Sequence, residues 1–256
     1  AMAENAGAVG LSNTASGQSA LAFGNSNTAS ALNGMAFGNN NNVSGEYSAA
    51  FGRSNVIAGY NSVAAGIANT VSGEYANALG SLNTASASSS VAVGRSNVAA
   101  GGYAISVGGF NNAGGAYASS IGYQNQASGA RGSAVGYRNN ASGEQSSAFG
   151  LLNEASGILS SAFGNQNKSS GNSSSVFGTN NDAKGHVSSV FGHNNLVETN
   201  GYASVAIGTS ARIYAGHATG VGQSAYIGAD AKGGWAMGGW YDSDGNGVVA
   251  NDGSES

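Results

Sequence analysis

A glycine recurs every fourteen residues through most of this 256-residue chain, and no other feature constrains the fold as strongly. The register glycines are Gly10, Gly24, Gly38, Gly52, Gly66, Gly80, Gly94, Gly108, Gly122, Gly136, Gly150, Gly164, Gly178 and Gly192. An asparagine follows each by three residues, from Asn13 to Asn195, and a second small residue, usually glycine, follows by seven. The pattern predicts one structural unit, or coil, per fourteen residues, each stacked on its neighbours.

Each coil has room for two short strands and two turns, because strands of four or five residues are common and glycine or asparagine supplies the positive φ of tight turns. In the coil of Gly52 we expect a first strand at residues 48–51, and in the next coil a second strand at residues 69–72. A helix is excluded, since two glycines per fourteen residues would each cost about 1 kcal/mol relative to alanine in a helix interior. The fold class is therefore all-β.

The two strands differ in how they face water, as period-two alternation shows. In the second strand, polar residues such as Thr14 and Thr70 alternate with apolar ones such as Val43 and Ile57, so one side is exposed to solvent and the other is buried. The first strand carries apolar or small residues on both sides, which is typical of a strand whose two faces are both buried. The interior of one chain can cover only one side. The other side therefore needs a second copy of the chain against it, which predicts a closed assembly of identical chains. The sequence is compatible with either two-fold or three-fold symmetry.

Two columns of the first strand are candidates for these two sides. The apolar column directly precedes the register glycines and is predicted to form the core: Val9, Phe23, Phe37, Phe51, Leu79, Val93, Ile121, Phe149, Phe163, Phe177 and Phe191. The alanine column stands one residue earlier and supplies the predicted interface between chains: Ala22, Ala36, Ala50, Ala64, Ala92, Ala134, Ala148 and Ala162.

Composition excludes several classes of function. Charged residues make up only 8% of the chain and the net charge is −4, so nucleic acid is not an expected partner. Without cysteine there are no disulfides, thiol nucleophiles or thiolate metal sites. No apolar run approaches the roughly 20 residues that span a membrane, so we expect no membrane contact by these residues.

The repeat resembles the YadA-like head of trimeric autotransporter adhesins. The family's S-V-A-[IV]-G motif has close matches at residues 62–66, 90–94 and 204–208, and the likeness covers roughly residues 7–238. The resemblance implies a left-handed parallel β-roll, a solenoid of 14-residue coils, that assembles as a homotrimer. It also implies a place on the cell surface, outside the cell, held on a Gram-negative outer membrane by regions not in this chain.

The repeat loosens after Gly192, where the spacing of glycines becomes sixteen at Gly208, fourteen at Gly222 and sixteen at Gly238. We place insertions in residues 196–200 and 229–234. The predicted organisation is a regular roll over residues 1–208, irregular final coils of the same roll over 209–238, and a tail or following subdomain over 239–256. An atypical end is expected of a stacked repeat.

The tail offers the one candidate metal site. Asp242, Asp244 and Asn246 match the first half of a Ca²⁺ loop, but the twelfth position, which needs a bidentate glutamate, is Gly253. A polar turn is the alternative, and no other cofactor is expected. His186, His193 and His217 occupy different repeat positions and form no catalytic or metal-binding pattern.

Two further columns have predicted roles. The asparagine column is expected to form a hydrogen-bonded ladder of side-chain amides. Tyr47, Tyr75, Tyr103 and Tyr117 stand five residues before a register glycine and are candidate ligand contacts, with packing in the turn as the alternative.

The pattern favours a non-enzymatic adhesive head that presents one weak contact surface many times, so that avidity replaces a single tight pocket. Expected partners are a host matrix protein, a cell, another bacterium or an abiotic surface. A structural spacer with the binding tip elsewhere is the main alternative. An ice-binding solenoid is disfavoured because Asn42 and Val56 interrupt the threonine column.

Overall fold

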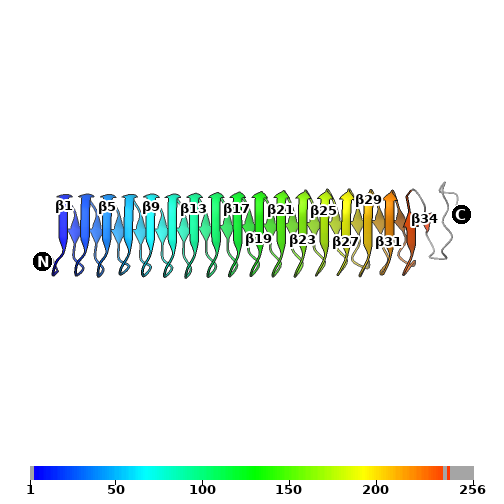
Figure 1. Ribbon diagram of the computed structural model, residues 1–256, viewed down its shortest axis with the longest axis horizontal. Coiled ribbons are helices and arrows are strands. Elements are labelled where there is room, and N and C mark those ends of the chain that lie inside the picture. The colour runs from blue at the N-terminus through cyan, green and yellow to red at the C-terminus, as the bar shows by residue number, and fades with distance from the viewer. Residues whose placement is uncertain (1–2, 239–240, 243–256) are drawn as a thin grey trace. The chain divides into compact units, whose positions relative to one another are not determined.

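The computed structural model describes residues 3–238 and 241–242, all of them in strands, turns or irregular backbone. The chain divides into two compact units, residues 1–127 and 128–256. In each unit, long strands alternate with two-residue strands along the chain (Figure 1); the long strands have five residues each, except the three-residue β33. The described residues include no helix long and apolar enough to cross a membrane. The predicted all-β class is confirmed.

The first unit contains the long strands β1 (Gly7–Leu11), β3 (Leu21–Asn25), β5 (Met35–Asn39), β7 (Ala49–Arg53), β9 (Val63–Ile67), β11 (Asn77–Ser81), β13 (Val91–Arg95), β15 (Ile105–Gly109) and β17 (Ser119–Tyr123). Its short strands are β2 (Thr14–Ala15), β4 (Thr28–Ala29), β6 (Asn42–Val43), β8 (Val56–Ile57), β10 (Thr70–Val71), β12 (Thr84–Ala85), β14 (Val98–Ala99), β16 (Asn112–Ala113) and β18 (Gln126–Ala127).

The second unit contains the long strands β19 (Ser133–Tyr137), β21 (Ser147–Leu151), β23 (Ser161–Asn165), β25 (Ser175–Thr179), β27 (Ser189–His193), β29 (Val205–Thr209), β31 (Thr219–Gln223) and β33 (Trp235–Met237). Its short strands are β20 (Asn140–Ala141), β22 (Glu154–Ala155), β24 (Lys168–Ser169), β26 (Asp182–Ala183), β28 (Leu196–Val197), β30 (Arg212–Ile213), β32 (Tyr226–Ile227) and β34 (Tyr241–Asp242).

Within each unit every long strand pairs in parallel with the next long strand, and the short strands do the same. Phe37 of β5 pairs with Phe51 of β7, and Val43 of β6 pairs with Ile57 of β8, so equivalent residues lie side by side at the period of fourteen. The predicted solenoid of stacked coils is therefore confirmed. Pairing of Gly192 with Gly208, and of Val221 with Met237, keeps equivalent positions aligned through the sixteen-residue coils.

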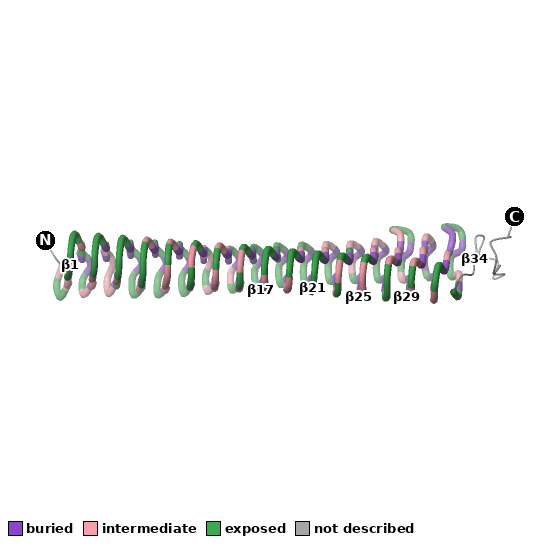
Figure 2. Tube along the Cα trace, turned by 90° about the horizontal axis from the view of Figure 1, so that it is seen from above, coloured by how far each residue is buried: buried purple, intermediate pink, exposed green. Residues whose placement is uncertain are grey.

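The extra residues of the sixteen-residue coils lie in turns. Gly201 N–H donates to the Glu198 carbonyl at 2.8 Å, and Gly234 N–H donates to the Ala231 carbonyl at 2.9 Å. These turns bulge from the side of the second unit in Figure 2. The predicted insertion at residues 229–234 lies wholly outside the strands, whereas the predicted range 196–200 begins within β28 (Leu196–Val197), and its turn follows that strand.

The register glycines are required by both conformation and space. Gly52 has a φ of 114°, a value that residues with a side chain rarely adopt. A Cβ there would also lie 2.1 Å from the carbonyl oxygen of Gly66 in the next coil. Since coils approach this closely at each register position, the same residue recurs there.

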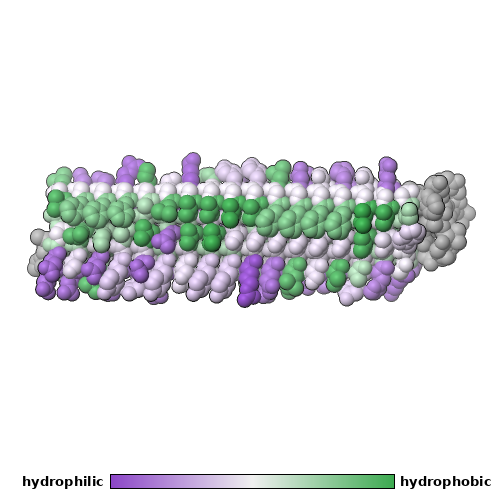
Figure 3. Space-filling model, in the orientation of Figure 1, coloured by the Kyte–Doolittle hydropathy of each residue, from purple (hydrophilic) through white to green (hydrophobic). Residues whose placement is uncertain are grey.

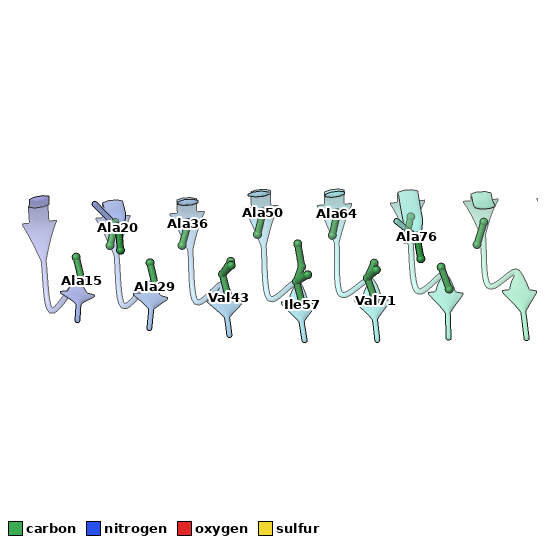
Figure 4. Packing of buried hydrophobic residues seen from close by; sticks show 14 of the residues in the cluster. Ala15, Ala20, Ala29, Ala36, Val43, Ala50, Ile57, Ala64, Val71 and Ala76 are labelled. Atoms are coloured by element: carbon green, nitrogen blue, oxygen red, sulfur yellow. The ribbon is translucent and has the colours of Figure 1, made fainter. Parts of the chain in front are cut away.

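The core of each coil is thin and built from small side chains. Figure 4 shows Ala50 of the long strand directed toward Ile57 of the short strand, with Ala36 and Val43 arranged in the same way. All four are fully buried. In most coils one buried alanine opposite one alanine, valine or isoleucine fills the narrow space between the two layers of strands, and serine or valine replaces that alanine at Ser106, Ser120, Val176 and Val190.

Candidate functional site

The structure reverses the two columns of the long strand that the sequence analysis assigned. The alanine column lies inside its own coil, and its members are completely buried within a single chain: Ala22, Ala36, Ala50, Ala64, Ala92, Ala134, Ala148 and Ala162. The prediction that these side chains form the surface between chains is therefore wrong. No surface of theirs is left for a second chain to cover.

The apolar column points outward instead, so its assignment to the core is also wrong. Phe51 is 44% exposed, Leu79 41% and Ile121 39% in the first unit, and Phe177 and Phe191 are 38% and 39% exposed in the second. The column forms a green stripe along each unit in Figure 3. The long strand does carry two apolar faces, as predicted, but the face left open by a single chain is the one with the largest side chains.

The phenylalanines of this column form rigid stacks. Phe23, Phe37 and Phe51 stack with centroid separations of 5.2 and 5.5 Å. Phe149, Phe163, Phe177 and Phe191 stack with separations of 5.0, 5.0 and 5.2 Å and interplanar angles below 10°. A Phe side chain brings about 150–250 Å² of apolar area. At Phe51, Phe177 and Phe191, where roughly two-fifths of the side chain is open, each coil exposes about 60–100 Å² of this area, which is worth about 1.5–2.5 kcal/mol if covered.

The asparagine column forms the predicted ladder of amides. Asn41 Nδ2 donates to Asn27 Oδ1 at 3.0 Å and also lies within hydrogen-bond distance of the Phe37 and Gly52 carbonyls. The same Asn27 Oδ1 accepts the Asn41 backbone N–H at 3.1 Å. In the second unit the ladder ends at Asn195, whose Oδ1 accepts the backbone N–H of Ala211 at 2.8 Å. The column therefore has a structural role, because its polar atoms are bound within the coil turns.

The tyrosine column lies on the surface of the first unit. Tyr47, Tyr75, Tyr103 and Tyr117 are 48–58% exposed. Each also has a φ between 56° and 59°, in the left-handed region that disfavours large side chains. Tyr103 and Tyr117 stack at 5.0 Å.

Sequence reasoning missed Tyr60, which joins this surface from the neighbouring position of the intervening coil. Its ring lies 5.6 Å from both Tyr47 and Tyr75, at steep interplanar angles. The signal was present in the sequence, since Tyr60 stands one residue off the tyrosine column. In a stack of coils, adjacent columns touch across adjacent repeats.

Charged residues on the short strands of the second unit, or directly after them, form two separate groups of ion pairs. Lys168 Nζ lies 3.3 Å from Glu154 Oε2, and Lys184 Nζ lies 2.7 Å from Glu198 Oε1 and 3.8 Å from Asp182 Oδ2. The hydrogen bond from Lys184 lowers the pKa of Glu198 and raises that of Lys184. Burial raises the pKa of Asp182 despite the two lysines.

The candidate Ca²⁺ loop falls mostly outside the described residues. Asp244 and Asn246 are not among them, and of Asp242 only the backbone is described, in β34. Among the described residues there is no cluster of three or more histidine, aspartate or glutamate side chains that could hold a metal ion.

Parallel stacked coils, a ladder of internal amides and an apolar outer stripe define a parallel β-solenoid of the repeat class. A family model described as the YadA head domain repeat (2 copies) matches residues 15–41, 29–55, 58–83, 78–97, 113–139, 127–152 and 155–181. These matches cover more than half of the chain, which therefore belongs to the YadA head family. This is a family of adhesins and not of enzymes. A search of curated proteins finds no significant match.

Proposed function

We propose that this chain is the adhesive head of a trimeric autotransporter, in which three copies pack the outward faces of their long strands against one another. The observation that carries the proposal is the apolar column. An open apolar stripe repeated in coil after coil exceeds what a monomeric soluble protein normally exposes, and such stripes mark contacts between proteins. Family membership supports three chains as the number that close the assembly.

The adhesive role follows from repetition. Apart from the long-strand face, each coil presents two turns and the outer side of a short strand, and these surfaces recur in every copy of the chain. Many weak contacts made together bind strongly through effective concentration, without one tight pocket. The family's adhesins are anchored in the outer membrane and act at the cell surface; we assign this chain the same location and, as targets, host matrix, cells, other bacteria or abiotic surfaces.

Light scattering and a binding panel test the two parts of the proposal. We expect a particle of three chains of 24.8 kDa each, and attachment to at least one of collagen, fibronectin, cells or plastic. A trimer that attaches to none of them would favour the spacer over the adhesive head.

A charge placed on the proposed interface tests the assembly. Phe163→Asp puts a carboxylate between two stacked rings of the apolar column, where three chains would have to bury it. We expect this variant to keep its β-structure by circular dichroism but to elute as a single chain. Asn112→Asp, on the exposed side of a short strand, is the matched control and should stay trimeric. A trimeric Phe163→Asp variant would overturn the assignment of the face.

A further inference from the structure

Six residues in three successive coils of the first unit form one exposed patch at the turn that precedes the long strand. We call Glu46, Tyr47, Tyr60, Asn61, Glu74 and Tyr75 the tyrosine patch; all six are exposed. One column of the patch reads Glu46, Tyr60, Glu74 and the adjacent column reads Tyr47, Asn61, Tyr75. Backbone hydrogen bonds fix these columns, since Asn61 N–H donates to the Glu46 carbonyl at 2.9 Å and Tyr75 N–H to the Tyr60 carbonyl at 2.8 Å.

The three rings form a connected aromatic surface. Tyr60 lies between Tyr47 and Tyr75, with centroids 5.6 Å away on each side and interplanar angles of 70° and 79°. The three side chains are 48%, 39% and 50% exposed in chain order. Each ring is supported by its neighbour and still keeps an open surface for a ligand.

The fold itself does not call for tyrosine at these positions. The turn residue before the long strand is Asn33 in the coil before Tyr47 and Asn61 in the coil after it, and asparagine accepts the left-handed φ more readily. Tyr47 and Tyr75 adopt the same φ, at 57° and 56°. Packing in the turn therefore does not explain why large aromatic side chains stand here.

The patch is also negatively charged and has no cation of its own. Glu46 and Glu74 flank Tyr60 in one column, two coil spacings apart, or roughly 10 Å. Neither carboxylate forms an ion pair with a described residue. The described cations of the first unit are Arg53 and Arg95, each at the far end of a long strand from this turn. A ligand has to bring the positive charge.

A tyrosine ring attracts a cation to its face, and two flanking carboxylates strengthen that attraction. We propose that the tyrosine patch binds a basic polypeptide segment, with a lysine or arginine side chain over Tyr60 between Glu46 and Glu74 and the stem of that side chain against Tyr47 or Tyr75. The inference names the partner chemistry of an adhesive surface and so rests on the proposed function. Phosphate-rich or sulfated polymers are repelled by the same carboxylates.

The test measures binding of the whole assembled chain to an immobilised lysine–glycine peptide, with a glutamate–glycine peptide as the charge-reversed probe. We expect the lysine peptide to bind, the glutamate peptide not to bind, and affinity to fall as salt is added. The double variant Glu46→Gln with Glu74→Gln, and separately Tyr60→Asn, should each weaken binding by about tenfold, equivalent to about 1.4 kcal/mol. Light scattering and circular dichroism confirm that each variant stays assembled and folded.

Tyr103 and Tyr117 supply the matched control. They are exposed tyrosines of the same column, but the residues before them are Gly102 and Ala116, so no carboxylate flanks them. Tyr103→Asn with Tyr117→Asn should leave binding of the lysine peptide unchanged.

If the parent chain and the Glu46→Gln, Glu74→Gln variant bind the lysine peptide equally well, the proposal is overturned. Tighter binding of a neutral oligosaccharide than of the lysine peptide at the tyrosine patch would overturn it as well. If that variant still attaches to the surfaces of the panel while neither the parent chain nor any variant binds the lysine peptide, only the basic ligand is wrong. If the assembled parent chain attaches to nothing, the proposed adhesive function fails instead.

Discussion

Removing one amide from the asparagine ladder should destabilise the fold far more than its size suggests. Asn69 Nδ2 donates to Asn55 Oδ1 at 3.0 Å and lies within hydrogen-bond distance of the Ala65 and Gly80 carbonyls. Its Oδ1 accepts both the backbone N–H and the Nδ2 of Asn83, each at 3.1 Å. Asn69→Ala removes all of these bonds from a completely buried site.

The largest single cost is the orphaned backbone N–H of Asn83, because a buried donor without a partner costs about 1–3 kcal/mol. Asn83 Nδ2 keeps its bonds to the Leu79 and Gly94 carbonyls, so it adds little. Loss of the donors to the Ala65 and Gly80 carbonyls adds roughly 1 kcal/mol. We therefore expect Asn69→Ala to lower the free energy of unfolding by about 2–4 kcal/mol per chain.

Denaturant unfolding at fixed chain concentration measures the total, and hydrogen exchange at the Asn83 amide locates the cause. The amide should exchange faster in Asn69→Ala than in the parent chain. Asn112→Ala is the control, since Asn112 lies exposed on a short strand and its loss should change stability by no more than about 0.5 kcal/mol. Equal stability of the Asn69→Ala and Asn112→Ala variants would refute the structural role of the ladder.

Three further predictions follow from particular residues. Gly52→Ala should lower the free energy of unfolding by at least about 2 kcal/mol, because it combines a positive φ with a Cβ that overlaps the next coil. Gly102→Ala, where a Cβ meets nothing within 4 Å, should be nearly neutral. Similar unfolding midpoints for the two variants would contradict the requirement for glycine at the register positions. Val187→Asn should stabilise the chain by about 1 kcal/mol, since Val187 is exposed with a φ of 57° and asparagine relieves that strain; a lower midpoint in guanidinium would contradict this. Burial raises the pKa of Asp182 in the folded chain. Above that raised pKa the ionised carboxylate therefore lowers the free energy of unfolding, and this cost disappears as the pH falls below the unfolded pKa of about 3.9. Asp182→Asn should accordingly exceed the parent in stability at neutral pH, with the difference shrinking on acidification; a difference independent of pH would reject the assignment.

Much of the fold could be predicted from the sequence, because the period of fourteen determines which residues become neighbours. Once Gly52 aligns with Gly66, Asn55 must lie beside Asn69, and the ladder follows. The two apolar faces of the long strand could be predicted as well, since alternation reveals them directly.

Which face points inward could not be read from alternation alone. Phe51 and Ala50 both lie in apolar columns, and size suggested that phenylalanine fills the core. The interior is too narrow for it, since Ile57 of the short strand already occupies the space opposite Ala50. The presence of valine and isoleucine in the buried column of the short strand was the signal that the facing column had to be small. The tyrosine surface was found only in part, because Tyr60 belongs to an adjacent column.

Coverage of the apolar column by other copies of the chain is the central structural claim. Hydroxyl-radical footprinting of the assembled protein measures this directly, residue by residue. Phe177 and Phe191 should be protected, while Tyr103, which lies on a turn and is 57% exposed, should be oxidised readily. Oxidation of the two phenylalanines to the extent expected of side chains nearly two-fifths open to water would mean that no neighbouring chain covers them, and would contradict the account.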